Sequence, residues 1–272
     1  MSNIKTLGVL SATLLASLSE KGDYIFTIQD AVDILGVQPY VAQDLLRRLV
    51  ARKWVKRLER GKYMILPLES GLSGTYTQHE FLIAATFIAP YYISYWTALS
   101  HYGFTEQVAR TIFVATRKQK RPVEVSGITF QFVRLAKRKF FGFVQEWIED
   151  KQVNIASREK TLVDCLDLPR YCGGVAEAIK GLWYGYEEKT LDWDTLTEYA
   201  ERMGNRTIFK RLGYLTEVLK LPIGEHISLW HSKISSGYPK LDPTMGKTGS
   251  YNTRWNLLVN LNREDLLAWR EH

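Results

Sequence analysis

The sequence is poor in cysteine. Only Cys165 and Cys172 occur among its 272 residues. Their spacing does not supply the close ligand pairs of a zinc site, and two cysteines do not form a disulfide framework. We therefore expect both thiols to be reduced and the protein to be cytoplasmic.

Targeting and membrane-spanning patterns are also missing. The N-terminal residues place one basic residue, Lys5, before a short apolar run that serines interrupt, which is unlike a signal peptide. No window reaches the roughly 18 consecutive apolar residues of a membrane helix. The most apolar run, residues 81–95, contains Pro90. We expect no membrane partner.

Motifs of catalysis and cofactor binding are absent from the sequence. It contains no H-E-x-x-H pair, glycine-rich phosphate loop, G-x-S-x-G elbow or kinase motif. Asp164 lies in an apolar helical pattern, so we interpret it as a surface or buried, paired residue. We expect no enzyme, cofactor or metal site, with a nucleotide-binding or enzymatic C-terminal domain as an alternative. The scattered histidines are interpreted as structural: His79, His101, His226 and His231.

Positive charge, in contrast, is abundant and unevenly distributed. The net charge is +7. Residues 1–67 carry ten basic and six acidic residues, and residues 105–141 carry nine basic and two acidic residues. Residues 68–104 contain no Lys or Arg, and residues 142–272 are slightly acidic. Two basic blocks separated by an apolar, aromatic stretch favour an anionic partner.

The N-terminal block has the order of a winged helix-turn-helix. A first helix is predicted to end before Gly22, and a second is predicted from an N-cap at Thr27 to a stop at Gly36. Pro39 fits the first turn of a third helix. Alternating apolar residues on both sides of Arg60-Gly61 then predict a hairpin. In this arrangement the third helix enters the DNA major groove and the hairpin follows the backbone.

Residues from the third helix and the hairpin are suited to contact DNA. Lys and Arg attract phosphates, whereas Gln and Arg also match the edges of adenine and guanine. The stretch from Arg47 to Lys62 holds eight basic residues and a single acid, Glu59. A solvated surface and a protein-interaction module are the alternatives. The predicted DNA-binding residues are Gln38, Tyr40, Gln43, Arg47, Arg48, Lys56, Arg57, Arg60 and Lys62.

The remaining chain reads as a larger mixed domain. We predict an α+β fold with a winged helix-turn-helix in residues 1–67 and an α/β domain in residues 68–272, mostly helical toward its C-terminus. Two helices are expected to join near Pro90. The further predicted elements are strands at 110–116 and 127–135, a hairpin around Glu149-Asp150, a helix after Ser157, and helices near 174–185, 192–203 and 205–220, followed by a strand and a short helix in the C-terminal tail.

A second basic block accompanies the two predicted strands. Its cations cannot be buried without partners. A solvated loop and a second nucleic-acid surface are equally compatible with it. The aromatic residues just before it (Tyr91, Tyr92, Tyr95, Trp96 and Tyr102) are interpreted as core rather than as a platform for bases. The members of the block are Arg117, Lys118, Lys120, Arg121, Arg134, Lys137, Arg138 and Lys139.

Several segments together resemble the AbiEi-type antitoxin family of abortive-infection toxin–antitoxin systems. They are found in one order along the chain, and with the predicted winged helix the resemblance covers about residues 5–220. Residues 221–272 carry no matching feature. The segments are residues 94–99 (SYWTAL), 105–116, 140–142 (FFG), 158–164 (REKTLVD) and the turn at 172–174 (CGG).

The resemblance implies a transcriptional autorepressor and type IV antitoxin. Such proteins join a winged-helix domain to a larger antitoxin domain, and they bind repeats in double-stranded promoter DNA. They counteract a nucleotidyltransferase-like toxin without a stable complex. Relatives also occur without an adjacent toxin, so a stand-alone transcriptional regulator is the alternative.

Overall fold

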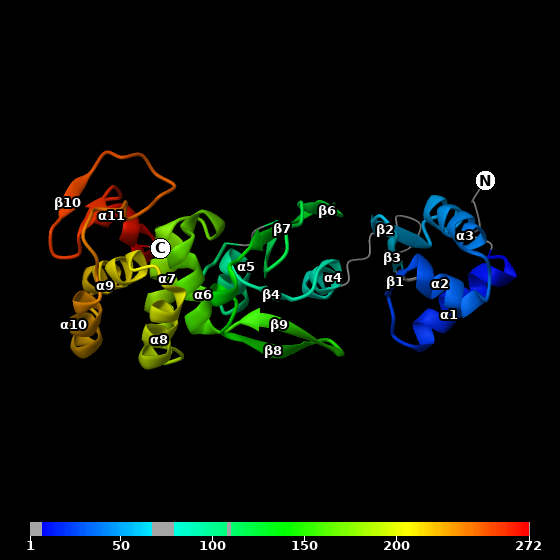
Figure 1. The fold of residues 1–272 in the computed structure, drawn as a ribbon, viewed down its shortest axis with the longest axis horizontal. Helices are drawn as coiled ribbons and strands as arrows, with labels where there is room; N and C mark the ends of the chain where they lie inside the picture. The colour runs from blue at the N-terminus through cyan, green and yellow to red at the C-terminus, as the bar shows by residue number, and fades with distance from the viewer. Residues whose placement is uncertain (1–6, 67–78, 108–109, 272) are drawn as a thin grey trace. The chain divides into compact units, whose positions relative to one another are not determined.

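The chain forms two compact units in a computed structural model that describes residues 7–66, 79–107 and 110–271 (Figure 1). One unit comprises the chain up to Thr86 together with Val123–Gly127, and the other comprises Phe87–Pro122 and the chain from Ile128 onward. The predicted domain boundary after residue 67 lies outside the described residues.

Three helices make up most of the first unit. They are α1 (Val9–Glu20), α2 (Ile28–Leu35) and α3 (Pro39–Ala51). The predicted cap of α2 is present: Thr27 accepts from the Asp30 amide while Asp30 accepts from the Thr27 amide. Gly36 ends α2 in the left-handed conformation, where a side chain would be strained. These caps set the turn that separates α2 from α3.

A small sheet completes the winged helix. Strands β2 (Val55–Glu59) and β3 (Lys62–Ile65) form the predicted hairpin, with Gly61 at positive φ in the turn. A short strand that was not predicted, β1 (Ile25–Thr27), pairs with β3 and gives the order β1-β3-β2. Three residues are too few for a period-two pattern to stand out.

The core of the first unit joins all three helices to the hairpin. Helix α4 (Glu80–Phe87), except for its last residue, and strand β6 (Val123–Val125) also belong to this unit. Four apolar side chains in or next to the hairpin are buried: Trp54, Val55, Leu58 and Tyr63. The helices contribute Leu14, Leu15, Leu18, Ala31, Ala42, Leu45, Leu46 and Leu49.

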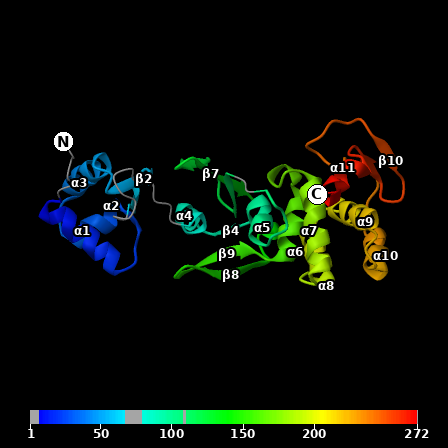
Figure 2. The ribbon, with the colours of Figure 1, turned by 180° about the vertical axis from the view of Figure 1, so that it is seen from behind.

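The second unit is built on a mixed sheet, seen from behind in Figure 2. The strand order runs β7-β5-β4-β9-β8, in which β5 and β7 are parallel and β8 and β9 form the predicted antiparallel hairpin. The strands are β4 (Tyr91–Ile93), β5 (Thr111–Thr116), β7 (Ile128–Arg134), β8 (Phe143–Ile148) and β9 (Lys151–Ala156).

Strand β4 corrects the prediction of two helices joined near Pro90. The segment after Pro90 is a strand between β5 and β9, antiparallel to the first and parallel to the second. All three of its residues are buried, so it lacks the polar alternation by which a strand is recognised. Helix α5 (Tyr95–His101) follows it directly.

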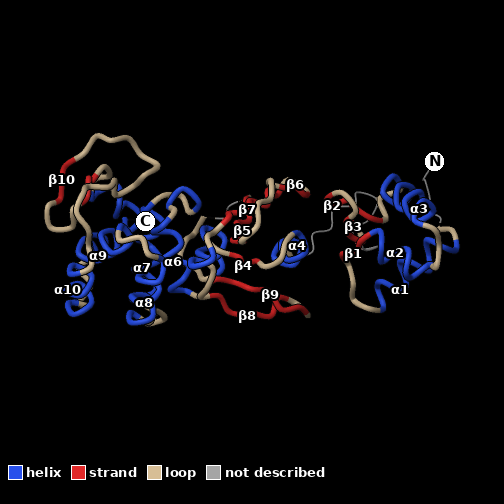
Figure 3. Tube along the Cα trace, viewed as in Figure 1, coloured by secondary structure: helices blue, strands red, loops and turns tan. Residues whose placement is uncertain are grey.

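Helices fill the C-terminal part of the second unit, as predicted (Figure 3). Helix α6 (Arg158–Asp167) is central: α5, α7, α8 and α9 all contact it, and every residue from Lys160 to Asp167 is buried. The other α-helices are α7 (Val175–Glu187), α8 (Trp193–Met203), α9 (Thr207–Leu219), α10 (Gly224–Ser232) and α11 (Arg263–Leu267). Short 3-10 turns occupy Lys137–Lys139, Pro169–Tyr171 and Ala268–Glu271.

Two cations of α9 fasten the last part of the chain to the helices. Lys210 donates to the carbonyls of Ser236, Gly237 and Asn256. Arg211 donates to the carbonyls of Leu166, Lys240 and Leu241, and burial lowers its pKa to about 10.

The C-terminal segment also carries a second small sheet. Strands β10 (Ser250–Asn252) and β11 (Leu257–Val259) pair with each other. Helix α10 and the β10-β11 pairing were not predicted, because this segment lacks a clear helical or alternating pattern. Within the part of the chain that the structure describes, no helix combines the length and apolar character needed to cross a membrane.

Candidate nucleic-acid interface

Helix α3 turns a polar face away from the core. Its buried side chains Leu45, Leu46 and Leu49 lie on the opposite face. Tyr40 is 72% exposed, and Gln43 and Arg47 are exposed with it. The predicted recognition helix therefore presents hydrogen-bonding groups at a spacing of three and four residues, which is one face of a helix.

A groove brings this face of α3 together with the hairpin. It has a volume of about 490 Å³. Five of the nine predicted DNA-binding residues line it: Tyr40, Gln43 and Arg47 from α3, and Arg57 and Arg60 from the hairpin. Its remaining lining residues are Ile28, Asp44, Gly61 and Tyr63.

The groove also contains a carboxylate, Asp44, that is not among the predicted site residues. Asp44 Oδ1 lies 2.5 Å from Arg47 Nη2, and Asp44 Oδ2 lies 3.3 Å from Arg48 Nε. These side chains are largely exposed, so the ion pairs are weak and exchange readily with solvent or another anion. The spacing of three residues between Asp44 and Arg47 on one helix was a sequence signal for this pair.

The other four predicted residues do not line this groove. Gln38 is the N-cap residue of α3, and Arg48 lines a separate groove beside α1. Lys56 donates to Ser126, while Lys62 donates to the Thr86 carbonyl and lies 3.2 Å from Glu59. Arg57 lines the groove and its neighbour Lys56 does not, because successive side chains of β2 point to opposite faces of the strand.

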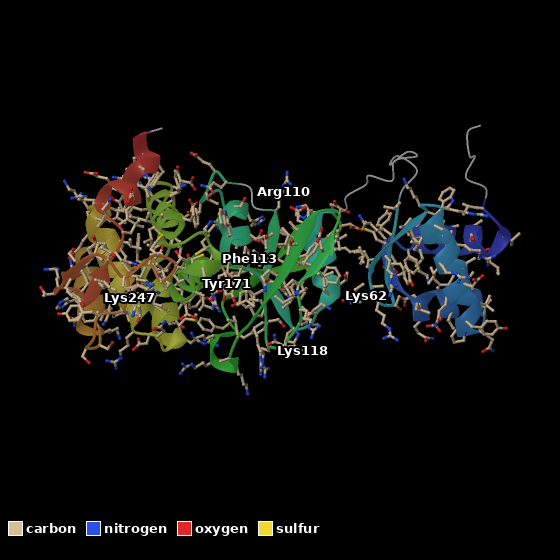
Figure 4. The ribbon with its side chains drawn as sticks, turned by 90° about the horizontal axis from the view of Figure 1, so that it is seen from above. Lys62, Arg110, Phe113, Lys118, Tyr171 and Lys247 are labelled. Carbon is tan, nitrogen blue, oxygen red and sulfur yellow. The ribbon has the colours of Figure 1, made fainter. Side chains whose placement is uncertain are left out.

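The second basic block gathers mainly at one edge of the larger sheet. Strands β5 and β7 run parallel with Thr116 opposite Arg134, so their carboxyl ends coincide. Arg117 and Lys118 follow β5, and Lys137 and Arg138 follow β7; all four are exposed, as is Arg134. Figure 4 shows Lys118 at the outside of this unit. Arg121, further along the chain after β5, is also exposed.

Two members of the block have partners within the second unit. Lys139 Nζ lies 2.6 Å from Asp167 Oδ2, and the ion pair is largely buried. The Lys120 ammonium lies 5.6 Å and 5.5 Å from the ring centroids of Phe87 and Phe132. The exposed cations at this edge are therefore fewer than the eight that the sequence indicated.

The aromatic residues between the basic blocks form core, as interpreted from the sequence. Tyr92 and Tyr95 are fully buried. The ring centroids of Tyr95 and Tyr171 are 5.3 Å apart, and those of Phe113 and Tyr171 are 5.8 Å apart (Figure 4). These rings pack against each other, so they do not form a surface on which bases could stack.

Asp164 is buried and paired, one of the two placements expected for it. Its carboxylate accepts from Tyr92 Oη at 3.1 Å, from Ser94 Oγ at 2.8 Å and from the Lys160 ammonium. Burial raises the pKa of this carboxyl, and the Lys160 charge opposes the rise. Lys160 and Asp164 both lie on α6, and the hydrogen bonds from Tyr92 and Ser94 to Asp164 join β4 and the residue after it to α6. All of these hydrogen-bond partners lie within the second unit.

The other titratable groups that the sequence singled out are dispersed. His101 Nε2 lies 2.8 Å from Glu146, His226 Nε2 lies 3.0 Å from Asp194, and His231 bonds the Arg254 carbonyl. Cys165 and Cys172 are unpaired and buried. Among residues 7–66, 79–107 and 110–271, no group of three His, Cys, Asp or Glu side chains is placed to hold a metal ion.

Part of the N-terminal unit matches a known family model. Residues 14–65 match the model of a family described as "Transcriptional regulator, AbiEi antitoxin". The resemblance inferred from the sequence is confirmed over these residues, which include most of the winged helix, while the segments at 94–174 lie outside the match. No curated protein matches the chain.

The fold of the whole chain also has a counterpart among solved structures. The crystal structure of the RV2827C protein from Mycobacterium tuberculosis matches with a TM-score of 0.67 over 99% of this chain and 97% of that one. The two sequences are 14% identical. This likeness concerns the fold alone.

Proposed function

We propose that this chain, whose residues 14–65 match the AbiEi-type antitoxin regulators, is a DNA-binding transcriptional autorepressor. The groove between α3 and the hairpin is the observation that supports the proposal most strongly. It combines Gln43 and Arg47 on a helix with Arg57 and Arg60 on the wing. A winged helix-turn-helix uses these same two elements on the major groove and the adjacent backbone.

The residues of the groove have different roles in this proposal. Gln43 and Arg47 carry the donors and acceptors that read base edges in the major groove. Arg57 and Arg60 carry charge on the wing, where they neutralise phosphates and set affinity rather than sequence preference. Tyr40 lies beside them with its hydroxyl available to a phosphate.

The basic edge of the larger sheet is proposed as a second nucleic-acid surface. Arg117, Lys118, Arg134, Lys137 and Arg138 are exposed and sit at the aligned carboxyl ends of β5 and β7 or just after them. Like charges are brought together here at a cost in repulsion that an anionic partner would relieve. Such a surface would add phosphate contacts to those of the winged helix and would raise affinity for longer DNA.

We further propose that the protein is a type IV antitoxin that binds repeats in its own promoter. The support is the family match together with the resemblance of residues 94–174, and the implied partner is a nucleotidyltransferase-like toxin that forms no stable complex with it. A stand-alone regulator is the alternative. Co-expression with the gene next to its own distinguishes them: rescue of growth from that gene's toxicity supports the antitoxin role.

A gel shift with DNA from upstream of the protein's own gene tests DNA binding. The triple variant Arg47→Ala, Arg57→Ala, Arg60→Ala should lose binding, and the dependence on salt should weaken by about 0.9 log–log units per lost phosphate contact. A matched control replaces the exposed Lys21, Arg206 and Lys247 with Ala and removes the same charge elsewhere. Equal binding by the two triple variants would refute the assignment of the groove.

A further inference from the structure

Two lysines of the hairpin bind parts of the first unit that lie far away in the sequence. Lys56 on β2 donates to the Ser126 hydroxyl. Lys62 on β3, labelled in Figure 4, donates to the Thr86 carbonyl. Ser126 follows β6 and Thr86 lies in α4, and both belong to the first unit. Each strand of the hairpin is therefore attached to an element outside residues 14–65, which match the regulator family.

The acceptor of Lys62 lies near the carboxyl end of a helix. Helix α4 ends at Phe87, so the Thr86 carbonyl is among the last four, which have no amide partner within the helix. The carboxyl end of a helix also carries partial negative charge, which favours an ammonium group. Lys62 thus supplies a donor to a backbone acceptor that the helix itself leaves without one.

Lys62 also lies at the base of the wing turn. It is paired with Thr27 of β1 on one side and with Glu59 of β2 on the other. Its ammonium lies 3.2 Å from the Glu59 carboxylate. Arg60, which lines the groove, lies in the turn between Glu59 and Lys62. The position of Arg60 therefore depends on how firmly Lys62 is held.

Strand β2 is the outer strand of the small sheet, whose order is β1-β3-β2. Its register with β3 shifts between Arg57 and Glu59. A two-stranded hairpin is only marginally stable by itself. The hydrogen bond from Lys56 to Ser126 gives this strand a second attachment, directly beside Arg57, which lines the groove.

We propose that Lys62 and Lys56 are positioning residues of the DNA-binding groove and do not themselves contact DNA. Lys62 holds the wing turn for Arg60, and Lys56 holds β2 for Arg57. The inference rests on the proposed function of the groove, and it gives both lysines a role other than the DNA contact that their sequence pattern predicted. A wing that is fixed before DNA arrives loses less conformational freedom on binding, so affinity is higher.

The charge of Lys62 is used inside the protein. Its side chain is 25% exposed, whereas that of Arg47 in the groove is 82% exposed. The salt dependence of DNA binding comes from side chains that neutralise phosphates and release counterions. Loss of the Lys62 ammonium should therefore lower affinity without changing the slope of log affinity against log salt concentration.

Titrations of the full chain with DNA from upstream of its gene, at several salt concentrations, test this signature. Lys62→Met keeps the apolar stem and removes the ammonium, and we expect about three- to tenfold weaker binding at an unchanged slope. Lys62→Arg retains a charged donor and should restore most of the affinity. Lys240→Met is the matched control and should bind like the wild type, because Lys240 also donates to backbone carbonyls but lies in the second unit.

Hydrogen exchange of the full chain without DNA tests the positioning role independently of the proposed function. Amides of residues 57–61 should exchange faster in Lys62→Met than in the wild type, while those of α3 should be unchanged. Ser126→Gly removes the partner of Lys56 without changing the charge, and glycine suits the positive φ at this position. It should speed exchange at Arg57, and it tests the attachment of β2 even if Lys62→Met fails to fold.

Three results would overturn the proposal. The first is wild-type affinity in Lys62→Met. The second is a salt slope reduced by about 0.9 in that variant, which would make Lys62 a phosphate contact. The third is unchanged exchange of the wing in Lys62→Met or Ser126→Gly. A wild-type protein that binds no DNA would instead refute the proposed function, and hydrogen exchange would then decide alone whether the two lysines hold the wing.

Discussion

Asp44 accepts the guanidinium of Arg47 at 2.5 Å inside the groove between the recognition helix and the wing. In the proposed DNA complex, a carboxylate at this place opposes phosphate binding. While the exposed ion pair is formed, it also favours one orientation of the Arg47 fork, and an arginine reads guanine through a correctly oriented fork.

Asp44→Ala should accordingly separate affinity from selectivity. Loss of one negative charge should tighten binding to unrelated DNA by roughly two- to fivefold, in keeping with about 0.5–1 kcal/mol for an exposed charge. Preference for the operator over unrelated DNA should fall, because Arg47 is no longer oriented. Fluorescence anisotropy with both DNAs measures the ratio, and an unchanged ratio would show that Asp44 does not orient Arg47.

Lys56 and Arg57 form a matched pair of adjacent cations for a second prediction. Arg57 lines the groove, whereas Lys56 donates to Ser126. Arg57→Ala should weaken DNA binding and reduce the log–log salt slope by about 0.9. Lys56→Ala should leave the slope within error of the wild type. Titrations at several salt concentrations measure both, and equal slopes for the two variants would contradict the assignment.

The close packing around Gly213 predicts that a larger residue at this position destabilises the second unit. A Cβ atom added there would lie 2.0 Å from the ring of the fully buried Trp255. Gly213→Ala should therefore lower the free energy of unfolding by about 3 kcal/mol, the cost of overpacking a core. Gly224→Ala is the control, since nothing lies within 4 Å of its added Cβ. Chemical denaturation measures both, and a Gly213→Ala variant as stable as the control would exclude the close contact.

The buried carboxyl of Asp164 predicts a pH dependence of stability. Its pKa is raised above the ordinary value of 3.8, so the folded protein takes up a proton at a higher pH than the unfolded chain does. Stability contributed by this group should therefore increase as pH falls from the raised pKa toward 3.8.

Comparison of the wild type with Asp164→Asn isolates this effect. The free energy of unfolding of the wild type relative to the variant should rise as pH falls through that window. Asp167→Asn, in the same helix and paired with Lys139, controls for a nearby carboxylate. A wild-type-minus-variant difference that is constant with pH would show that Asp164 does not titrate there.

The winged helix was largely predictable because its signals are local. Thr27 with Asp30, Gly36, Pro39 and the Arg60-Gly61 turn each specify one boundary through a cap or a turn, and the structure places a boundary at each. The composition of the candidate site was only partly predictable. A residue's spacing on α3 indicates that it is exposed, but the contacts that remove Lys56 and Lys62 from the groove join residues 70 and 24 positions apart.

The larger unit was predicted less well where burial erases the pattern. Tyr91, Tyr92 and Ile93 are buried on both faces of the sheet, so neither a helical nor an alternating period marks them as a strand. Parallel β5 and β7 were each predicted, but their adjacency was not. That adjacency depends on pairing across residues 111–134 and is what gathers the second basic block at one edge.

Lys210 and Arg211 of α9 donate hydrogen bonds to carbonyls of the C-terminal segment, a structural role that the sequence of this segment does not indicate. Residues 221–272 lie beyond the resemblance to the antitoxin family, and a boundary drawn from likeness would cut the chain near Leu219. Such a truncation would remove five of the six carbonyl acceptors and leave only that of Leu166, so Lys210 and Arg211 would lose nearly all of the hydrogen bonds that hold them in the second unit. The smallest piece of the second unit that can fold by itself therefore extends well past the last residue that family likeness would include.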